Sequence, residues 1–295
     1  MCRLIGFASP VSTTLTEQIG AEQVNRFRDM STLHRDGWGS AWLEVPSDEP
    51  EPAFGGVDET AASASEPLLD SDSEQAAIKT YRTTDRAPED PVFTQVVDSH
   101  RSFARVVHLR WATEGLAIHP ENTHPFVADG IALAHNGSIS PLAELEAMLS
   151  PDILRSLHGR TDSERYLAVV RQELADEPDP LQAVARAVIR LRRHFPAASL
   201  NALVLSETTL MAVHASAASP APVKDMLSTG MDEADLPLGH LEGYFLMRWR
   251  DGPANSLIFS SSGLHIDGWH PLPPESITSV DLATMRTTVR ELTAG

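Results

Sequence analysis

Hydrophobic and polar positions along the chain indicate strands first, then helices, then strands again. Alternating or β-branched apolar runs predict early strands at Cys2–Ala8, Trp38–Val45, Ala104–Trp111 and Gly130–His135. Apolar residues at helical spacing predict helices over Thr14–Leu33, Asp162–Leu174 and Pro180–Phe195. Later strands are expected at Ser199–Ser206, Thr209–Ala215, Gly243–Arg250, Ser256–Ser261, Ile277–Leu282 and Met285–Leu292. This order favours two sheets covered by helices over repeated strand–helix–strand units.

Two local signals refine this pattern. Ser140 and Pro141 are a suitable N-cap and first residue for a further helix. The stretch Ser216–His240 has no clear periodicity and is expected to be a loop. The length of 295 residues allows one large domain or two small ones, and the family resemblance described below implies one domain over residues 2–295.

An acidic segment interrupts this domain at residues 46–90. From Pro46 to about Ser73 it is rich in Pro, Glu, Asp, Ser, Ala and Gly, and we expect an exposed, mobile insertion. A short strand at Ala77–Arg82 is expected to follow. Ser47–Asp90 holds 12 acidic and 3 basic residues, a net charge of -9 and half of the chain's total of -18.

Charge and composition exclude several classes of partner. A net charge of -18 repels polyanions, so neither nucleic acid nor an anionic membrane is an expected partner. No apolar run approaches the length of about 20 residues that spans a bilayer. The first residues do not form a secretory signal, because their apolar part is too short. A cytoplasmic location is expected.

The chain has 1 cysteine, Cys2, which directly follows Met1. An intramolecular disulfide and a structural zinc site built from several cysteines are therefore excluded. Removal of Met1 is expected because Cys is small, and it would leave a free α-amino group beside the thiol. That amine has a pKa of roughly 8 and can act as the general base for the thiol. The alternative is that Met1 stays and Cys2 is an inert strand residue.

Asn136 and Gly137 end the apolar run that begins at Gly130. Asn-Gly is a strong signal for a hairpin turn. In the same geometry the Asn136 side-chain amide and the Gly137 backbone N–H can converge on one oxygen and form an oxyanion hole. Both interpretations are compatible with the sequence alone.

Arg110 and Asp162 carry the charges that a free amino-acid head group would need. Arg110 lies in an otherwise apolar strand, where its planar guanidinium needs a partner and suits a carboxylate. Asp162 lies at a helix start and could hold an ammonium. The alternatives are a structural ion pair for Arg110 and a helix cap for Asp162.

Four histidines raise the question of a metal. His108, His119, His124 and His135 are scattered and lack tight ligand spacing such as His-Glu-x-x-His. We expect buried, hydrogen-bonded histidines with no metal and no cofactor.

Taken together, these motifs resemble the class II glutamine amidotransferases, a family of N-terminal-nucleophile hydrolases. The family pattern is an N-terminal Cys, His-x-Arg-x-Ala-Thr, Asn-x-His-Pro-Phe, His-Asn-Gly and Thr-Asp-Ser-Glu. It is matched in order by Cys2 and by residues 108–113, 122–126, 135–137 and 161–164. Residues 36–39, Asp-Gly-Trp-Gly, look like an element of the stand-alone, single-domain branch. Glu114 departs from the pattern of synthase-linked members, which often carry His there.

The resemblance implies an α+β fold, an αββα sandwich of two antiparallel sheets between helical layers. It also implies a role for each matched residue. Cys2 would be the nucleophile, and Asn136 and Gly137 the oxyanion hole. Arg110 would hold the substrate α-carboxylate and Asp162 its α-amino group, with Trp111 and Thr113 lining the pocket.

The substrate stays open between two enzymatic interpretations. One is glutamine hydrolysis through a thioester on Cys2, with ammonia passed to a separate synthase. The other is hydrolysis of a larger γ-glutamyl compound, as in relatives that act in ergothioneine synthesis or glutathione breakdown. A third alternative is a non-catalytic regulatory subunit, which the intact set of motif residues disfavours.

Overall fold

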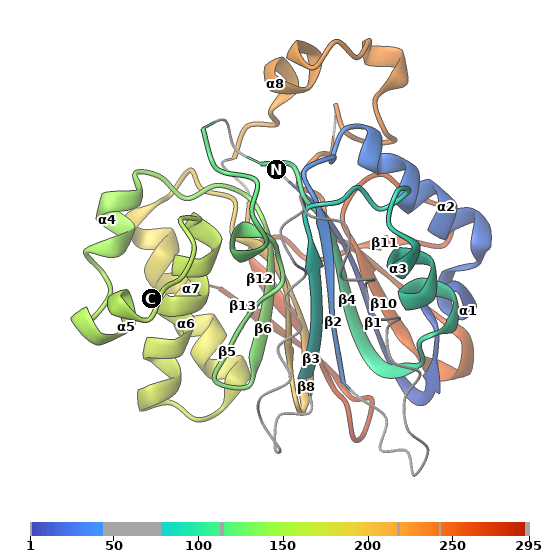
Figure 1. Ribbon diagram of the computed structural model, residues 1–295. Helices are drawn as coiled ribbons and strands as arrows, with labels where there is room; N and C mark the ends of the chain where they lie inside the picture. The colour runs from blue at the N-terminus through green and yellow to red at the C-terminus, as the bar shows by residue number, and fades with distance from the viewer. Residues whose placement is uncertain (1, 44–77, 113–114, 217–218, 242, 293–295) are drawn as a thin grey trace, which may run out of the picture.

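In the computed structural model, two antiparallel sheets face each other and helices cover the outer face of each (Figure 1). The structure describes residues 2–43, 78–112, 115–216, 219–241 and 243–292. This arrangement is the expected αββα sandwich and confirms the predicted α+β fold. None of the helices in the described part of the chain is long and apolar enough to cross a membrane.

The first sheet has seven strands and contains the N-terminal strand near its centre. Its spatial order is β11 (His270–Pro271), β9 (Arg248–Asp251), β10 (Leu257–Ser260), β1 (Arg3–Thr13), β4 (Ser102–Leu109), β2 (Trp38–Leu43) and β3 (Ile78–Thr83). β1 pairs with β4 in a register that sets Arg3 opposite Leu109 and Leu4 opposite His108. The residues that follow Cys2 are therefore fixed on both sides.

The second sheet has six strands and holds the other half of the expected site. Its order is β13 (Thr287–Glu291), β12 (Ser276–Asp281), β8 (Thr209–His214), β7 (Asn201–Ser206), β6 (Ile131–Asn136) and β5 (Phe126–Ala128). β6 pairs with β7 along its whole length, and Asn136 lies opposite Asn201. The last residue of β6 is thus held by the sheet.

The two-residue period of the strands divides their side chains between two cores. In β1, Leu4 and Ala8 pack between the sheets, whereas Ile5 and Phe7 pack against the helices of the outer layer. All four side chains are fully buried. Burial on both faces explains why this strand reads as a continuous apolar run rather than an alternating one.

Helices form the two outer layers (Figure 1). The seven-stranded sheet is covered by α1 (Leu15–Ile19), α2 (Ala21–Asp29), the 3-10 turn η1 (Met30–Thr32), α3 (Pro91–Thr94) and the π-helical turn η2 (Gln95–Ser99). The six-stranded sheet is covered by α4 (Leu142–Glu146), α5 (Pro151–Arg155), α6 (Asp162–Asp176) and α7 (Pro180–His194). α8 (Val223–Ser228) lies beyond the ends of the sheets, on the side where the N-terminus lies. Three further 3-10 turns are η3 (Pro120–Asn122), η4 (Glu233–Asp235) and η5 (Pro253–Asn255).

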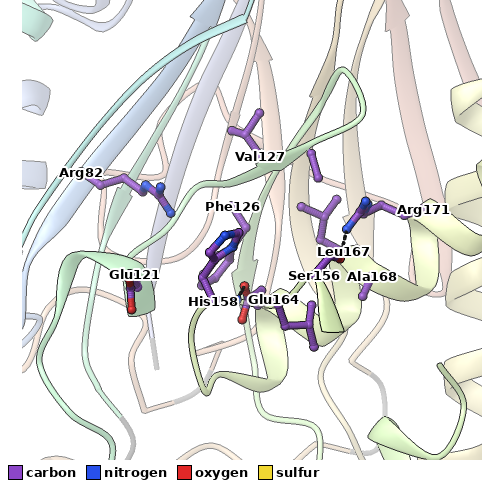
Figure 2. A pocket seen from close by; sticks show the side chains of 12 residues that line it. Arg82, Glu121, Phe126, Val127, Ser156, His158, Glu164, Leu167, Ala168 and Arg171 are labelled. Carbon is purple, nitrogen blue, oxygen red and sulfur yellow. Dashed lines mark hydrogen bonds between the residues drawn. The ribbon is translucent and has the colours of Figure 1, made fainter. Parts of the chain in front are cut away.

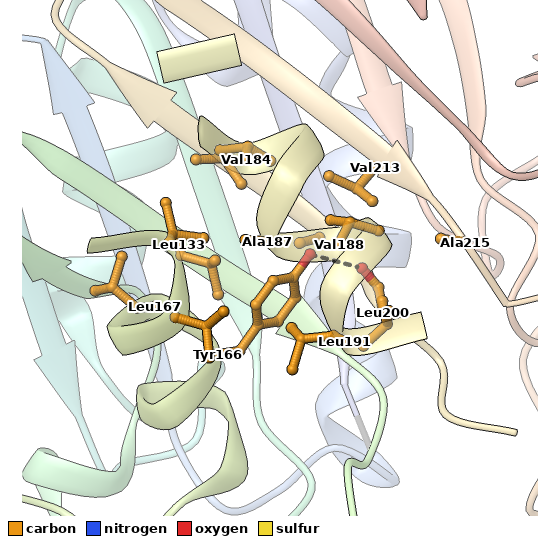
Figure 3. Packing of buried hydrophobic residues seen from close by; sticks show 14 of the residues in the cluster. Leu133, Tyr166, Leu167, Val184, Ala187, Val188, Leu191, Leu200, Val213 and Ala215 are labelled. Atoms are coloured by element: carbon orange, nitrogen blue, oxygen red, sulfur yellow. Dashed lines mark hydrogen bonds between the residues drawn. The ribbon is translucent and has the colours of Figure 1, made fainter. Parts of the chain in front are cut away.

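The packing of α6 and α7 on the six-stranded sheet is shown in Figure 3. Tyr166 of α6 is fully buried among aliphatic side chains that include Val188 and Leu191 of α7. Its hydroxyl donates to the carbonyl oxygen of Leu200 at 3.3 Å, so the buried polar atom is satisfied. Truncating an aromatic side chain in such a core typically destabilises a protein by about 3–5 kcal/mol. This layer therefore anchors α6, whose first turn carries Asp162.

Three expectations about local structure need correction. The helix expected over Thr14–Leu33 is broken at Gly20, whose φ of 83° is unfavourable for other residues. Pro141 occupies the N-cap of α4 itself, so Ser140 is not the cap. The strand expected from Gly243 begins at Arg248, because residues 243–247 are irregular, with a turn at Tyr244 and Phe245.

The expected insertion at 46–90 also needs a new boundary. Residues 46–77 lie outside the described residues, and the expectation of mobility stays untested there. Residues 78–83 form β3, which pairs with β2 along its length. Asp90 is buried and accepts hydrogen bonds from Trp38 Nε1 at 3.0 Å and the Tyr81 hydroxyl at 2.8 Å. Residues 78–90 therefore belong to the folded domain.

Candidate active site

Cys2 lies directly before β1 and is almost fully buried, with 6% of its surface exposed. Its backbone N–H donates to Asn136 Oδ1 at 3.1 Å, and its Sγ lies 4.0 Å from the carbonyl oxygen of Trp111. These partners are 134 and 109 residues away in the sequence. The start of β1 in one sheet and the end of β6 in the other therefore meet at the cysteine.

Asn136 is oriented by the bonds of its backbone and its side-chain oxygen. Its carbonyl oxygen accepts from Ser199 Oγ at 2.8 Å, and its Oδ1 is taken by Cys2. The remaining polar atom, Nδ2, is buried and has no hydrogen-bond partner among the described residues. A buried amide donor left unpaired destabilises a fold by about 1–3 kcal/mol. Such a donor is free to bind an oxygen atom of a ligand.

The close neighbours of position 137 leave no room for a side chain and so require glycine. A Cβ at this position would lie 2.0 Å from the carbonyl oxygen of Ser199 and 2.5 Å from His135 Nε2. After Asn136 the chain leaves the sheet and runs to α4, and β6 forms its hairpin with β5 instead. The hairpin-turn interpretation of Asn-Gly is therefore wrong. The pair ends a strand at the site.

Arg110 follows β4 and points its guanidinium at backbone carbonyls. Nη1 donates to the Asp36 oxygen at 3.2 Å and Nη2 to the Ala117 oxygen at 3.4 Å. Within the described part of the chain it has no carboxylate ion pair, and its side chain is buried. Burial lowers the pKa of Arg110, while the nearby Cys2 and Asp36 act in the opposite direction. The structural ion pair considered above is not found in this region, and the cation can accept an anionic ligand.

Asp162 is the first residue of α6 but does not cap it. The N-cap is Thr161, whose Oγ1 accepts from the Glu164 backbone N–H at 3.2 Å. Asp162 Oδ2 instead accepts from the Ile139 N–H at 2.6 Å. The carboxylate thus ties the start of α6 to the segment that follows Gly137. The capping interpretation is wrong for this residue.

A small cavity brings these residues together. Cys2, Arg110, Gly137 and Asp162 all line it, and Trp111 does as well. Its volume of about 20 Å³ is close to the space that one water molecule needs. A γ-glutamyl group therefore requires some of the lining to move. Thr113, expected to line the same pocket, lies outside the described residues.

A larger cavity of about 430 Å³ lies elsewhere, between β5 and α6 (Figure 2). None of the residues given a catalytic or substrate-binding role from the sequence lines it, although Phe126 and Glu164 of the matched motifs do. Two of its charged side chains are already engaged: Arg171 Nε donates to Asp129 at 2.8 Å, and Glu164 accepts the backbone N–H groups of His158 and Gly159. The smaller cavity at Cys2 is therefore the better candidate for the active site.

Sequence reasoning missed the residues that support Cys2 and the chain after β4. The Arg3 guanidinium donates to the Cys2 carbonyl oxygen at 2.6 Å and lies 4.0 Å from the centre of the Tyr244 ring. Asp36 Oδ2 accepts from the Ala112 N–H at 2.7 Å. An arginine between the cysteine and an apolar run is a signal that could have been read from the sequence, whereas its partner Tyr244 could not.

The four histidines behave differently from one another. His135 is buried and bonded as expected, to Ser163 Oγ at 2.9 Å and the Ser199 carbonyl oxygen at 2.8 Å. His119 is largely exposed, with 50% of its side chain accessible. His108 and His124 are buried and stacked, with ring centres 4.1 Å apart. No ring nitrogen of either residue has a hydrogen-bond partner among the described residues, which corrects the expectation for this pair.

The family model described as "Glutamine amidotransferases class-II" matches residues 1–226. A glutamine–fructose-6-phosphate aminotransferase (isomerizing) of Mesorhizobium japonicum is 39% identical over 88 residues, which are 30% of this chain and 14% of that protein. The corresponding protein of Brucella abortus is 37% identical over 93 residues, 32% of this chain and 15% of the relative. The match thus spans only a small part of these relatives.

Solved structures share the fold over the whole chain. A glutamine aminotransferase class-II domain protein from Silicibacter pomeroyi superposes with a TM-score of 0.59 and 18% identity, covering 99% of this chain and 100% of that one. A structure described as the allosteric regulatory enzyme of purine biosynthesis gives a TM-score of 0.55 at 12% identity, covering 100% of this chain and 50% of the other. At these identities the likeness concerns the fold alone.

Proposed function

The chain belongs to the class II glutamine amidotransferases, and from this premise we propose that it hydrolyses the γ-glutamyl amide of glutamine, or of a related γ-glutamyl compound, through a thioester on Cys2. The observation that carries this proposal is the relation between Cys2 and Asn136. The Asn136 oxygen accepts from the Cys2 nitrogen at 3.1 Å, while its amide nitrogen is buried and unpartnered among the described residues.

The first chemical step needs a base for the Cys2 thiol. Once Met1 is removed, the nitrogen that donates to Asn136 becomes a primary amine. Its pKa of roughly 8 leaves part of it neutral at pH 7, and the neutral amine accepts the thiol proton directly or through one water. The thiolate then attacks the amide carbon, and the carbonyl electrons move to the oxygen.

The resulting oxyanion is stabilised by Asn136 Nδ2 and the Gly137 N–H in this proposal. The α-ammonium returns its proton to the leaving nitrogen, the C–N bond breaks, and ammonia or an amine departs. Water, deprotonated by the same amine, then cleaves the γ-glutamyl thioester and releases glutamate. Fixed donors at the oxyanion typically contribute a factor of about 100–1000 each.

Arg110 and Asp162 hold the amino-acid end of the substrate. A buried guanidinium that contacts only backbone carbonyls in the described chain is suited to an α-carboxylate, which it can bind through two nitrogens. The Asp162 carboxylate is suited to the α-ammonium. Trp111 and Thr113 line the pocket in this proposal. Fixing the head group orients the amide carbon beside Cys2.

Head-group recognition of this kind does not select the leaving group. Glutamine and a larger γ-glutamyl amide offer the same carboxylate and ammonium to Arg110 and Asp162. If glutamine is the substrate, the ammonia is used by a separate synthase, which is then the partner we propose. If a larger amide is the substrate, no ammonia acceptor is needed.

The experiment is release of glutamate from a panel of glutamine, γ-glutamyl dipeptides and glutathione by the purified protein. We expect release from at least one member, and loss of release in Cys2→Ser. His119→Ala, which changes an exposed side chain, is the matched control and should keep full activity. Absence of glutamate from every substrate would favour the regulatory-subunit alternative and overturn the proposal.

A further inference from the structure

His108 and His124 surround the cysteine thiol with two imidazole rings. One ligand atom from each residue, the Cys2 Sγ and a ring nitrogen of each histidine, lies within 4.8 Å of the other two. All three residues are buried. In a tetrahedral zinc site with metal–ligand distances of about 2.0–2.3 Å, sulfur and nitrogen ligands lie roughly 3.5 Å apart. The ligand atoms would approach one another by roughly 1 Å to reach that geometry.

The imidazoles are not engaged elsewhere in the described structure. Both ring nitrogens of His108 and both of His124 are buried without a hydrogen-bond partner among the described residues. Leaving such groups unpaired destabilises a fold, so a ligand that uses them recovers part of that free energy. In contrast, both nitrogens of the neighbouring His135 are bonded, and His135 is not available.

The backbone holds the pair in place from two sides. His108 lies in β4, opposite both Leu4 of β1 and Gly39 of β2. Gly39 also makes room for the segment of His124, since a Cβ there would lie 2.2 Å from the His124 carbonyl oxygen. The stacked rings therefore lie at a fixed position beside the start of β1. His108 belongs to β4 of one sheet, and His124 belongs to the segment that leads to β5 of the other.

Arg110 also lines the cavity at Cys2, and its positive charge acts against a bound cation. The thiolate that forms at Cys2 on metal binding offsets this charge.

We propose that Cys2, His108 and His124 form a binding site for a thiophilic transition-metal ion such as Zn²⁺. Binding releases the thiol proton to solvent and leaves the fourth coordination position for water. The metal and an amide substrate compete for the same sulfur. Resting on the proposed function, the consequence is an amidohydrolase that is reversibly inhibited by Zn²⁺ and reactivated by a chelator.

Cobalt spectroscopy tests the site without reference to activity. Co²⁺ added to the chelator-treated, purified full chain should give the visible bands of tetrahedral cobalt and a thiolate-to-cobalt charge-transfer band, saturating at one equivalent. Zn²⁺ should remove both bands and raise the melting temperature by mass action. Absence of the charge-transfer band, or saturation only at several equivalents, would overturn the proposal.

Three variants locate the ligands. Cys2→Ser preserves side-chain volume and should abolish the charge-transfer band. His124→Gln should weaken Zn²⁺ binding by about 100-fold or more, measured by competition with a chromogenic chelator. His119→Gln, an exposed histidine on the same segment, should bind like the parent protein. Equal Zn²⁺ affinity in all three variants and the parent protein would contradict the assignment of the ligands. If His124→Gln fails to fold, the Cys2→Ser spectrum alone tests the assignment.

The metal site and the amidohydrolase can fail separately. A protein that binds one Co²⁺ through Cys2 but releases no glutamate keeps the site and loses the proposed function. An active protein whose glutamate release is unchanged by Zn²⁺, and which shows no cobalt–thiolate band, keeps the function and loses the site.

Discussion

The backbone nitrogen of Cys2 and the side chain of Asn136 are joined by a hydrogen bond of 3.1 Å, although the two residues are 134 positions apart and lie at the ends of strands in different sheets. The bond fixes the direction of the Asn136 amide, because the Cys2 nitrogen holds its oxygen and Nδ2 is left without a partner among the described residues. It also positions the nitrogen that is the proposed base once Met1 is removed. One contact thus orients the proposed base and the proposed oxyanion donor.

The first prediction concerns the donor side of this contact. Asn136→Ala should lower kcat for the best amide substrate by about 100-fold or more, since one oxyanion donor is lost. KM should change much less, because the head group is held by Arg110 and Asp162. Steady-state kinetics measure both quantities, and circular dichroism verifies the fold. An unchanged kcat would reduce Asn136 to a structural residue.

The second prediction uses two glycines on either side of β6. Gly137→Ala should destabilise the protein by about 3 kcal/mol, because the new Cβ would press on the Ser199 carbonyl oxygen and the His135 ring. Gly130→Ala is the matched control: its surroundings are open, and only its φ of 73° is unfavourable, at about 1 kcal/mol. Denaturant unfolding compares the two. Equal losses would show that the space at Gly137 is not limiting.

The third prediction is acid sensitivity through buried histidines. Burial, with a contribution from Arg3, lowers the pKa of His240 to about 2, below the value of about 6.5 that an unfolded histidine has. The unfolded state therefore binds more protons, and the stabilisation is present above pH 6.5 and lost progressively as the pH falls toward 2. The limiting slope for one such group is about 1.4 kcal/mol per pH unit.

This dependence is checked by denaturant unfolding between pH 7 and pH 4. His240→Gln should show a shallower loss of stability on acidification than the parent protein. His265→Gln, which changes an exposed histidine with 43% of its side chain accessible, should follow the parent curve. Parallel curves for the parent protein and His240→Gln would show that His240 does not contribute to the acid response.

The sequence predicted the strands and the long helices because their patterns are local. The continuous apolar run of β1 and the helical spacing of α6 and α7 are visible within about ten residues each. The break at Gly20 was missed, because glycine is compatible with helical and non-helical backbone alike. The N-cap of α4 was placed one residue early, because the φ of a proline suits both an N-cap and a first helical residue. The short strands β5 and β11 contain too few residues to show a period, and only pairing with a neighbour defines them.

The candidate site was predictable in its members but not in its contacts. Cys2, Arg110, Asn136, Gly137 and Asp162 follow from motifs. The structure brings four of them to one cavity and joins Asn136 to Cys2 by a hydrogen bond. The Thr-x-x-Glu spacing already indicates Thr161 as the N-cap of α6, whereas no local pattern shows that Asp162 accepts from the Ile139 N–H. The pairing of His108 with His124 likewise arises only where two distant segments meet.

The central claim is that the amino group of Cys2 is the catalytic base, and a paired measurement of intact mass and activity tests it most directly. Protein with Met1 removed should release glutamate, whereas a variant engineered to retain Met1 should fold with the same melting temperature and lose nearly all activity. The physical reason is that an amide nitrogen is not basic at neutral pH and cannot take the thiol proton. Full activity in a preparation whose mass shows that Met1 is retained would contradict the account.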